Sequence, residues 1–173
     1  DRDGAYRTLK GNSTCAAGTG SFLDQQAGRL GLADSAELSR IALTNAGEPP
    51  KIASRCSVFA KTDLIHAQQE GYSLAEICDG LCLGLARNIA DTLGAGEELL
   101  EPVAFAGGVS RNEAVRRHLE RLLGVSIAVR ENSHLYGAAG ACLEALANGS
   151  FAEGTAARFL RPEDLVVPMP DSR

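Results

Sequence analysis

The sequence predicts an α/β domain, and three observations point to this class. In the second half of the chain, helical periodicity alternates with two short apolar runs, in the order helix, strand, helix, strand, helix. The 173 residues, 45% of them hydrophobic, are enough to build the core of one domain. Glycine pairs and helix-capping signals stand at the boundaries between these segments. Together these features are typical of helices layered on a sheet.

The first residues predict a turn and then a strand. Asp1 to Gly4 has the composition of a hairpin turn, and Ala5 to Leu9 follows as a strand. The strand that should precede the turn is missing, and the only methionine is Met169. We therefore expect the chain to be a piece of a longer protein. Residues 1–150 should form its domain, and residues 151–173 should form a C-terminal tail or linker, because they carry turn residues and weak periodicity.

Three helices are predicted in the first half of the chain. Apolar residues at helical spacing run from Ala16 to Leu30, and Gly31 to Asp34 interrupts them. A second helix runs from Ser35 to about Asn45, where a segment rich in glycine and proline stops it. A third helix begins near Ser57 and ends before Gly71.

Ser-x-x-Glu capping boxes predict the starts of two further helices, one from Ser73 to about Leu93 and one from Ser110 to Leu123. The glutamates of these boxes are Glu76 and Glu113. The remaining predicted elements are two strands, Pro102–Ala106 and Ser126–Val129, and a last helix, Leu135–Ala147.

Composition and charge exclude several classes of function. A net charge of −5 argues against nucleic acid or an anionic membrane as a partner, because both select clustered Lys and Arg. No apolar run approaches the roughly 20 residues of a membrane span, and no signal peptide is present. The five cysteines are an odd number, and Cys78 and Cys82 share one helix face. This pattern indicates a reducing, cytoplasmic compartment.

Two cysteines, Cys15 and Cys56, stand where a loop turns into a predicted helix. The N-terminus of a helix has unpaired backbone N–H groups and partial positive charge, so it stabilises a thiolate. Such thiolates are nucleophiles or metal ligands more readily than cysteines in the middle of a helix. One chain supplies two of them, whereas an iron–sulfur cube needs four. The pair therefore suggests a site that a second subunit completes.

Two glycine-rich segments are candidate binding loops. Gly18, Thr19 and Gly20 follow Cys15 at a helix start, where bare backbone can approach a phosphate or a cluster. In Phe105–Asn112 a predicted strand runs into two glycines and then a helix, which makes a shelf for a flat ligand. Each segment taken alone is equally explained as a tight turn.

The other cysteines and histidines are predicted to be structural or to lie on the surface. Cys78 and Cys82 have metal-ligand spacing, but their apolar neighbours favour burial as small hydrophobes, and Cys142 has the same surroundings. His66 and His118 have no cysteine or acid partner at metal spacing. His118 belongs to a helix with alternating charges, which is typical of an exposed face.

Taken in order, four motifs in this chain resemble those of one known family, the activator ATPases of 2-hydroxyacyl-CoA dehydratases. That family includes the ATPase subunits of benzoyl-CoA reductase. The resemblance covers roughly residues 4 to 147, and the stretch Lys61–Gln69 looks most like the large, multi-domain activases. The four motifs are Asn12–Leu23, which contains the specific Cys-Ala-Ala-Gly-Thr-Gly block, Arg55–Ala60, Phe105–Asn112 and Tyr136–Gly140.

The resemblance implies a fold and a reaction. Residues 1–150 would be the C-terminal ribonuclease-H-like ATPase domain of the actin, Hsp70 and sugar-kinase superfold, lacking its first strand. Nucleotide would bind in the cleft between two such domains. Family members are homodimers that hold one [4Fe–4S] cluster across the two-fold axis, and by motif its ligands here are Cys15 and Cys56. ATP hydrolysis changes the angle between the helices behind the cluster, and a low-potential electron passes to the dehydratase.

The same matching implies nucleotide contacts and partners. Gly107, Gly108 and Asn112 resemble the adenosine-side motif, and Gly137, Ala138 and Gly140 match the inter-domain connecting helix. The implied cofactors are the [4Fe–4S] cluster shared across a dimer and, in the full-length protein, ATP or ADP with Mg²⁺. The implied partners are a second copy of the chain and an acyl-CoA dehydratase or reductase component.

The chain departs from the family pattern in ways that leave alternatives open. The first phosphate loop with its domain, and the strand that carries the second phosphate loop, are absent, so we expect residues 1–173 alone not to hydrolyse ATP. Lys61-Thr62-Asp63 stands where the shorter activators usually carry Glu-Ser-Glu. One alternative is a small-molecule kinase of the same superfold, with Cys15 near a substrate instead of on iron. The other is a non-catalytic dimerisation or docking module.

Overall fold

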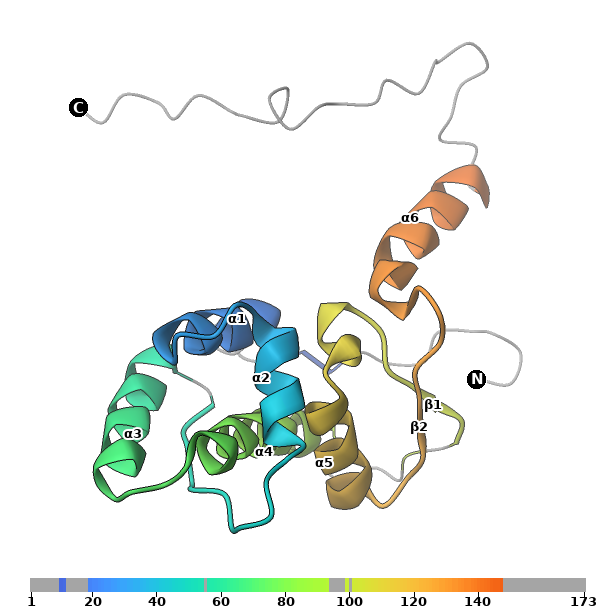
Figure 1. The fold of residues 1–173 in the computed structure, drawn as a ribbon. Helices are drawn as coiled ribbons and strands as arrows, with labels where there is room; N and C mark the ends of the chain where they lie inside the picture. The colour runs from blue at the N-terminus through green and yellow to red at the C-terminus, as the bar shows by residue number, and fades with distance from the viewer. Residues whose placement is uncertain (1–9, 12–18, 55, 94–98, 100, 148–173) are drawn as a thin grey trace, which may run out of the picture. The chain divides into compact units, whose positions relative to one another are not determined.

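The computed structural model describes residues 10–11, 19–54, 56–93, 99 and 101–147 (Figure 1). The predicted strand Ala5–Leu9 and the predicted tail 151–173 lie outside the described residues. The chain divides into two compact units, Asp1–Gly137 and Ala138–Arg173. The domain boundary expected near residue 150 falls where the chain is not described, so it stays a prediction.

Four helices form the first part of the described chain, and the sequence predicts all of them: α1 (Thr19–Arg29), α2 (Ser35–Ala42), α3 (Ser57–Gln69) and α4 (Leu74–Leu93). Helix α2 ends at Ala42, earlier than the predicted end at Asn45. The Asn45 side chain donates to the Gly47 carbonyl at 3.0 Å and accepts from the Gly47 N–H at 2.8 Å. This local turn competes with the helical hydrogen bonds and ends the helix.

The long helix α4 is the centre of the core. Its predicted capping box is confirmed, because Glu76 Oε2 accepts from the Ser73 N–H at 2.8 Å and Ser73 Oγ accepts from the Glu76 N–H at 3.3 Å. It packs against α2 and against α5 (Glu113–Leu123) (Figure 1). The predicted burial of Cys78 and Cys82 is also confirmed, since both are fully buried. The same prediction for Cys142 is wrong, because that cysteine is exposed on α6, which has no buried residue among those described. Burial raises the pKa of the Cys78 thiol to about 11 and raises the pKa of Cys82 as well.

Two short parallel strands, β1 (Val103–Ala104) and β2 (Ile127–Ala128), pair with each other at the predicted places. Both are shorter than predicted. Before β1, Pro102 has no N–H to donate to the ladder, and after β1, Gly107 turns the chain with φ 90°. The described chain is therefore mainly helical with a small parallel sheet, and the α/β prediction is confirmed only in this coarse form.

The capping box predicted for α5 is wrong. The cap is Asn112, whose extended backbone (φ −88°, ψ 100°) lets its Oδ1 accept from the Val115 N–H at 2.9 Å. Ser110 belongs instead to a short 3₁₀ turn, η2 (Gly108–Arg111), and its buried hydroxyl lies 2.8 Å from the hydroxyl of Ser133. The start of α5 is thus set by an asparagine two residues after the serine that the pattern selected.

The surface position predicted for His118 is also wrong. Only 6% of His118 is exposed, and its Nε2 lies 2.6 Å from Oδ1 of Asp79 on α4. The other carboxylate oxygen of Asp79 accepts from Asn45 Nδ2 at 3.0 Å. His118 lies on the side of α5 that also presents Ala114 and Leu119 to the core. The pair therefore ties α4, α5 and the loop after α2 together.

The last helix, α6 (Tyr136–Ala147), follows a second 3₁₀ turn, η3 (Ser133–Leu135). It matches the predicted helix Leu135–Ala147 except at its first residue. The Gly107 N–H donates to the Ser133 carbonyl at 3.1 Å, so η3 is attached to the turn after β1. None of the described helices is long and apolar enough to cross a bilayer.

Candidate functional site

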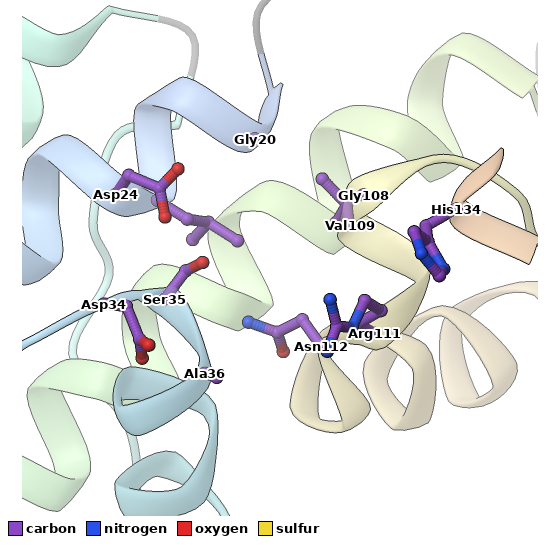
Figure 2. Close-up of a pocket in the computed structure, with 11 residues that line it drawn as sticks. Gly20, Asp24, Asp34, Ser35, Ala36, Gly108, Val109, Arg111, Asn112 and His134 are labelled. Carbon is purple, nitrogen blue, oxygen red and sulfur yellow. The ribbon is translucent and has the colours of Figure 1, made fainter. Parts of the chain in front are cut away.

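A cavity of about 380 Å³ opens between α1, the start of α2 and the turns η2 and η3 (Figure 2). Three residues predicted to bind a cofactor, Gly20, Gly108 and Asn112, line this one cavity. They come from two segments that are far apart in the sequence, namely α1 and the adjoining η2 and cap of α5. The packing of α1 against α2 and η2 therefore brings together residues that the sequence proposes separately.

Asn112 offers the cavity an unused hydrogen-bond donor. Its side chain is 5% exposed, and its Oδ1 serves the cap of α5 and also accepts from Cys82 Sγ at 3.8 Å. Its Nδ2 is buried and has no hydrogen-bond partner among the residues that the structure describes. Figure 2 shows this nitrogen on the side of Asn112 that faces Ser35. A buried donor without a partner is unfavourable, so a ligand acceptor at this point would be stabilised.

The predicted glycine shelf is open in the structure. Gly107 has φ 90°, a conformation that side chains other than glycine rarely adopt. A Cβ placed on Gly107 or Gly108 would meet no other atom within 4 Å, so the backbone there is bare. On the facing side, a Cβ on Gly20 would meet only Val109 Cγ2, at 3.8 Å. The backbone at Gly108 is therefore open to a ligand in the cavity.

Acidic and hydroxyl side chains stand on one wall of the cavity, and an arginine and a histidine stand on the other. Figure 2 shows Asp24, Asp34 and Ser35 on the side formed by α1 and α2, and Arg111 and His134 on the other side. Asp34 also caps α2 through its side chain. None of these five side chains was predicted as a binding group, although Arg111 belongs to the predicted shelf Phe105–Asn112. The helix predicted from Ser35 could have pointed to Asp34 and Ser35, because polar groups at a helix start are often exposed to a ligand. No local pattern points to Asp24 and His134, which only the packing of the elements brings to the cavity.

Cys56 occupies the environment that the sequence predicts. It is the N-cap of α3, with an extended backbone (φ −132°, ψ 121°), and its thiol is partly exposed and free. The backbone N–H groups of Phe59 and Val58 lower the pKa of this thiol below its ordinary value. These observations fit a cluster ligand, because the thiolate is the form that binds iron.

The remaining predicted site residues are not brought together in the described part of the chain. Cys15 and Gly18 lie outside it, and Thr19 is the first residue of α1. Within the residues that the structure does describe, no three His, Cys, Asp or Glu side chains gather as a metal site. The predicted cluster would take its other ligands from Cys15 and from a second copy of the chain, so it stays a prediction.

The fold is that of solved activator ATPases, which belong to the actin-like class. The ADPNP-bound activator of the 2-hydroxyisocaproyl-CoA dehydratase from Clostridium difficile matches with a TM-score of 0.69 and 31% identity, over 84% of this chain and 55% of that chain. Component A of the (R)-2-hydroxyglutaryl-CoA dehydratase from Acidaminococcus fermentans matches with a TM-score of 0.71 and 31% identity, over 81% of this chain and 53% of that one.

The sequence comparison then identifies the family. The BadF/BadG/BcrA/BcrD ATPase family model matches residues 1–145, and the chain belongs to this family. The 2-hydroxyisocaproyl-CoA dehydratase activator of Clostridioides difficile is 32% identical over 145 residues, 84% of this chain and 53% of the activator. A benzoyl-CoA reductase subunit from Thauera aromatica is 31% identical over 148 residues, 83% of this chain and 52% of that protein. The predicted resemblance is thus confirmed, and the chain spans about half the length of these relatives.

Proposed function

We propose that this chain is the nucleotide- and cluster-binding domain of an ATP-dependent activator. Such an activator passes a low-potential electron to a 2-hydroxyacyl-CoA dehydratase or a related CoA-substrate enzyme. The observation that carries the proposal is the convergence of Gly20, Gly108 and Asn112 on one cavity, where the buried Asn112 amide has an unused donor. The match to a relative that binds ADPNP supports the same interpretation.

The chemistry of the cavity suits the nucleoside part of a nucleotide. The Asn112 amide would donate to a ring nitrogen or an oxygen of the base, and the bare backbone at Gly108 would lie against its face. Asp24 and Ser35, on the opposite wall, would accept hydrogen bonds from ribose hydroxyls. Arg111 would add positive charge on the side away from the carboxylates. In this proposal the cavity holds the nucleoside and gives the nucleotide its orientation.

The cluster side of the proposal depends on Cys56 and Cys15. The start of α3 would hold the Cys56 thiolate through the N–H groups of Val58 and Phe59. When bound, a [4Fe–4S] cluster supplies one-electron transfer at low potential. A second copy of the chain would bring its own two cysteines across a two-fold axis, which accounts for four thiolates.

The nucleotide proposal is tested with Asn112→Asp in the full-length protein. This substitution keeps the oxygen that caps α5 but replaces the Nδ2 donor with a second acceptor. Titration calorimetry with Mg²⁺–ADP should show binding about tenfold weaker, because losing one hydrogen bond to a buried group amounts to about 1–3 kcal/mol.

The matched control is Gln69→Glu at the exposed end of α3, which makes the same change of charge away from the cavity. Its affinity for Mg²⁺–ADP should be that of the unchanged protein. If Asn112→Asp binds Mg²⁺–ADP as tightly as the control does, the proposal that this cavity holds the nucleoside is contradicted. Phosphorylation of a small molecule by an iron-free full-length protein would instead favour the kinase alternative.

A further inference from the structure

The cavity beside the cap of α5 carries negative charge on one side and positive charge on the other. Asp24 of α1 and Asp34, the cap of α2, line the side where Ser35 also lies, and Arg111 lines the opposite side (Figure 2). We call Asp24 and Asp34 the acidic wall. Like charges repel and opposite charges attract, so an anionic group on a ligand is opposed at the acidic wall and favoured near Arg111.

The acidic wall keeps its charge in the folded chain. Asp24 has no hydrogen bond or ion pair with any of the residues that the structure describes. Asp34 Oδ1 accepts from the Glu37 N–H at 2.8 Å, and this neutral donor leaves the carboxylate charged. In the described part of the chain, neither carboxylate is paired with a cationic side chain. Both charges are therefore available to act on a ligand.

The start of α2 would attract an anion if it had no acidic residues. Its first residues, Ser35 and Ala36, line the cavity, and the free N–H groups of a helix start act as about half a positive charge. Asp34 at the cap and Glu37 in the first turn bring two full negative charges to the same place. The two carboxylates outweigh the helix dipole, so this end of the cavity disfavours a phosphate.

A separate feature of the same cavity points to a ligand. Asn112 lines the cavity and is 5% exposed, and its buried Nδ2 has no partner among the residues that the structure describes. Figure 2 shows this nitrogen on the side of Asn112 that faces Ser35. A ligand that accepts a hydrogen bond from Asn112 therefore shares the cavity with the acidic wall.

We propose that Asp24 and Asp34 determine specificity by excluding nucleotides that carry a phosphate on the ribose. The ADP part of coenzyme A is such a nucleotide, because it differs from free ADP by a 3′-phosphate. The inference rests on the proposed function, in which ribose hydroxyls face Asp24 and Ser35. A hydroxyl donates a hydrogen bond there, whereas a phosphate is repelled. An activator that works beside a CoA-substrate enzyme meets both kinds of nucleotide, and the acidic wall would keep its cavity for ADP or ATP.

The experiment compares ligands that differ at the 3′ position, using titration calorimetry with the full-length protein and Mg²⁺. ADP measures the nucleotide affinity itself. The ratio of interest is the dissociation constant of 3′-phospho-ADP divided by that of 3′-O-methyl-ADP. Both derivatives lack the free 3′ hydroxyl and are larger there, but only the phosphate adds charge. We expect a ratio of at least about ten, from repulsion between like charges at short range. The ratio should fall between about 0.05 and 0.5 M salt, because salt screens charge and does not change size.

Asp24→Asn and Asp34→Asn test the two carboxylates. Each substitution removes one charge and keeps an oxygen that accepts hydrogen bonds, and asparagine caps a helix about as well as aspartate does. Each should lower the ratio about threefold, the size of an effect between partly exposed charges, and the double variant should lower it further. Glu70→Gln, at the exposed end of α3, makes the same change of charge outside the cavity and should leave the ratio unchanged. Binding of ADP shows that each variant is folded, and Asp24→Asn, which lies in no cap, decides alone if the Asp34 variant does not fold.

The outcomes separate this inference from the proposed function. If ADP binds but the ratio is near one, or does not change with salt, exclusion by charge is overturned while the nucleotide assignment stands. The same holds if the aspartate variants keep the ratio of the unchanged protein. If neither ADP nor its derivatives bind the unchanged protein, the proposed nucleotide site fails and the inference fails with it.

Discussion

Single side chains in this domain serve more than one contact. The side-chain oxygen of Asn112 caps α5 and also accepts from Cys82 Sγ on α4, while its buried nitrogen has no partner among the described residues. Asp79 accepts from Asn45 through one oxygen and contacts His118 through the other. Both residues join elements that are distant in the sequence, so replacing either one affects more than a local turn.

At this scale we predict that Asp79→Ala lowers the free energy of unfolding by about 2–3 kcal/mol, because it leaves the buried His118 ring and the Asn45 amide without their acceptor. Urea unfolding followed by circular dichroism measures this change. Glu48→Ala removes an exposed carboxylate from the loop after α2 and should change the stability little. A loss no greater than that of the Glu48 variant would show that the pair is not stabilising.

Helix ends and helix grooves decide how the elements meet. Helix α5 begins at Asn112, which caps it, so Ser110 is not needed as the cap. The Ser110 hydroxyl instead forms a hydrogen bond with the Ser133 hydroxyl, which joins η2 to η3. α4 accepts the segment before Cys56 because Gly80 and Gly84 leave room for its backbone. The cavity therefore lies beside the cap of α5, and the segment before Cys56 lies against α4.

At the scale of elements, we predict opposite effects for one substitution at two helical glycines. Gly84→Ala places a Cβ against the Ile52 carbonyl, and should destabilise the fold by about 1–3 kcal/mol through overpacking. Gly28→Ala on α1 meets no atom within 4 Å, and should stabilise the fold by up to about 1 kcal/mol through helix propensity. Thermal melting of both variants measures these changes. A Gly84→Ala variant as stable as the unchanged protein would show that the Ile52 backbone does not pack against Gly84.

On the scale of the whole molecule, the chain corresponds to about half of the length of its activator relatives. Its described part contains the cavity that we propose holds a nucleoside, and one cysteine at a helix start. In the proposed activator, a second copy of the chain would complete the cluster site. The dimer would therefore form together with the cluster.

We therefore predict that anaerobic reconstitution gives about four iron atoms per dimer, because a cube needs four thiolates. Cys56→Ser and Cys15→Ala should each abolish the iron and weaken dimer formation. Cys142→Ser, which removes an exposed cysteine that the proposal does not use, should keep both. Iron analysis combined with size-exclusion chromatography measures the outcome. Unchanged iron in the Cys56 or Cys15 variant would refute the ligand assignment.

Much of this domain could be predicted from local sequence signals. The capping box at Ser73, the helix starting near Ser57 and the burial of Cys78 and Cys82 follow from spacing over a few residues, and the motifs correctly indicated the family. Those signals act between near neighbours, where helix geometry alone decides which side chains meet.

The tertiary structure decided which residues meet across the chain. Local pattern selected Ser110 as a cap and placed His118 on the surface, but packing against η3 and α4 buries both. The meeting of Gly20, Gly108 and Asn112 at one cavity likewise depends on how α1 packs on α2 and η2. Burial and hydrogen-bond partners depend on contacts between distant segments, which no short window of sequence contains.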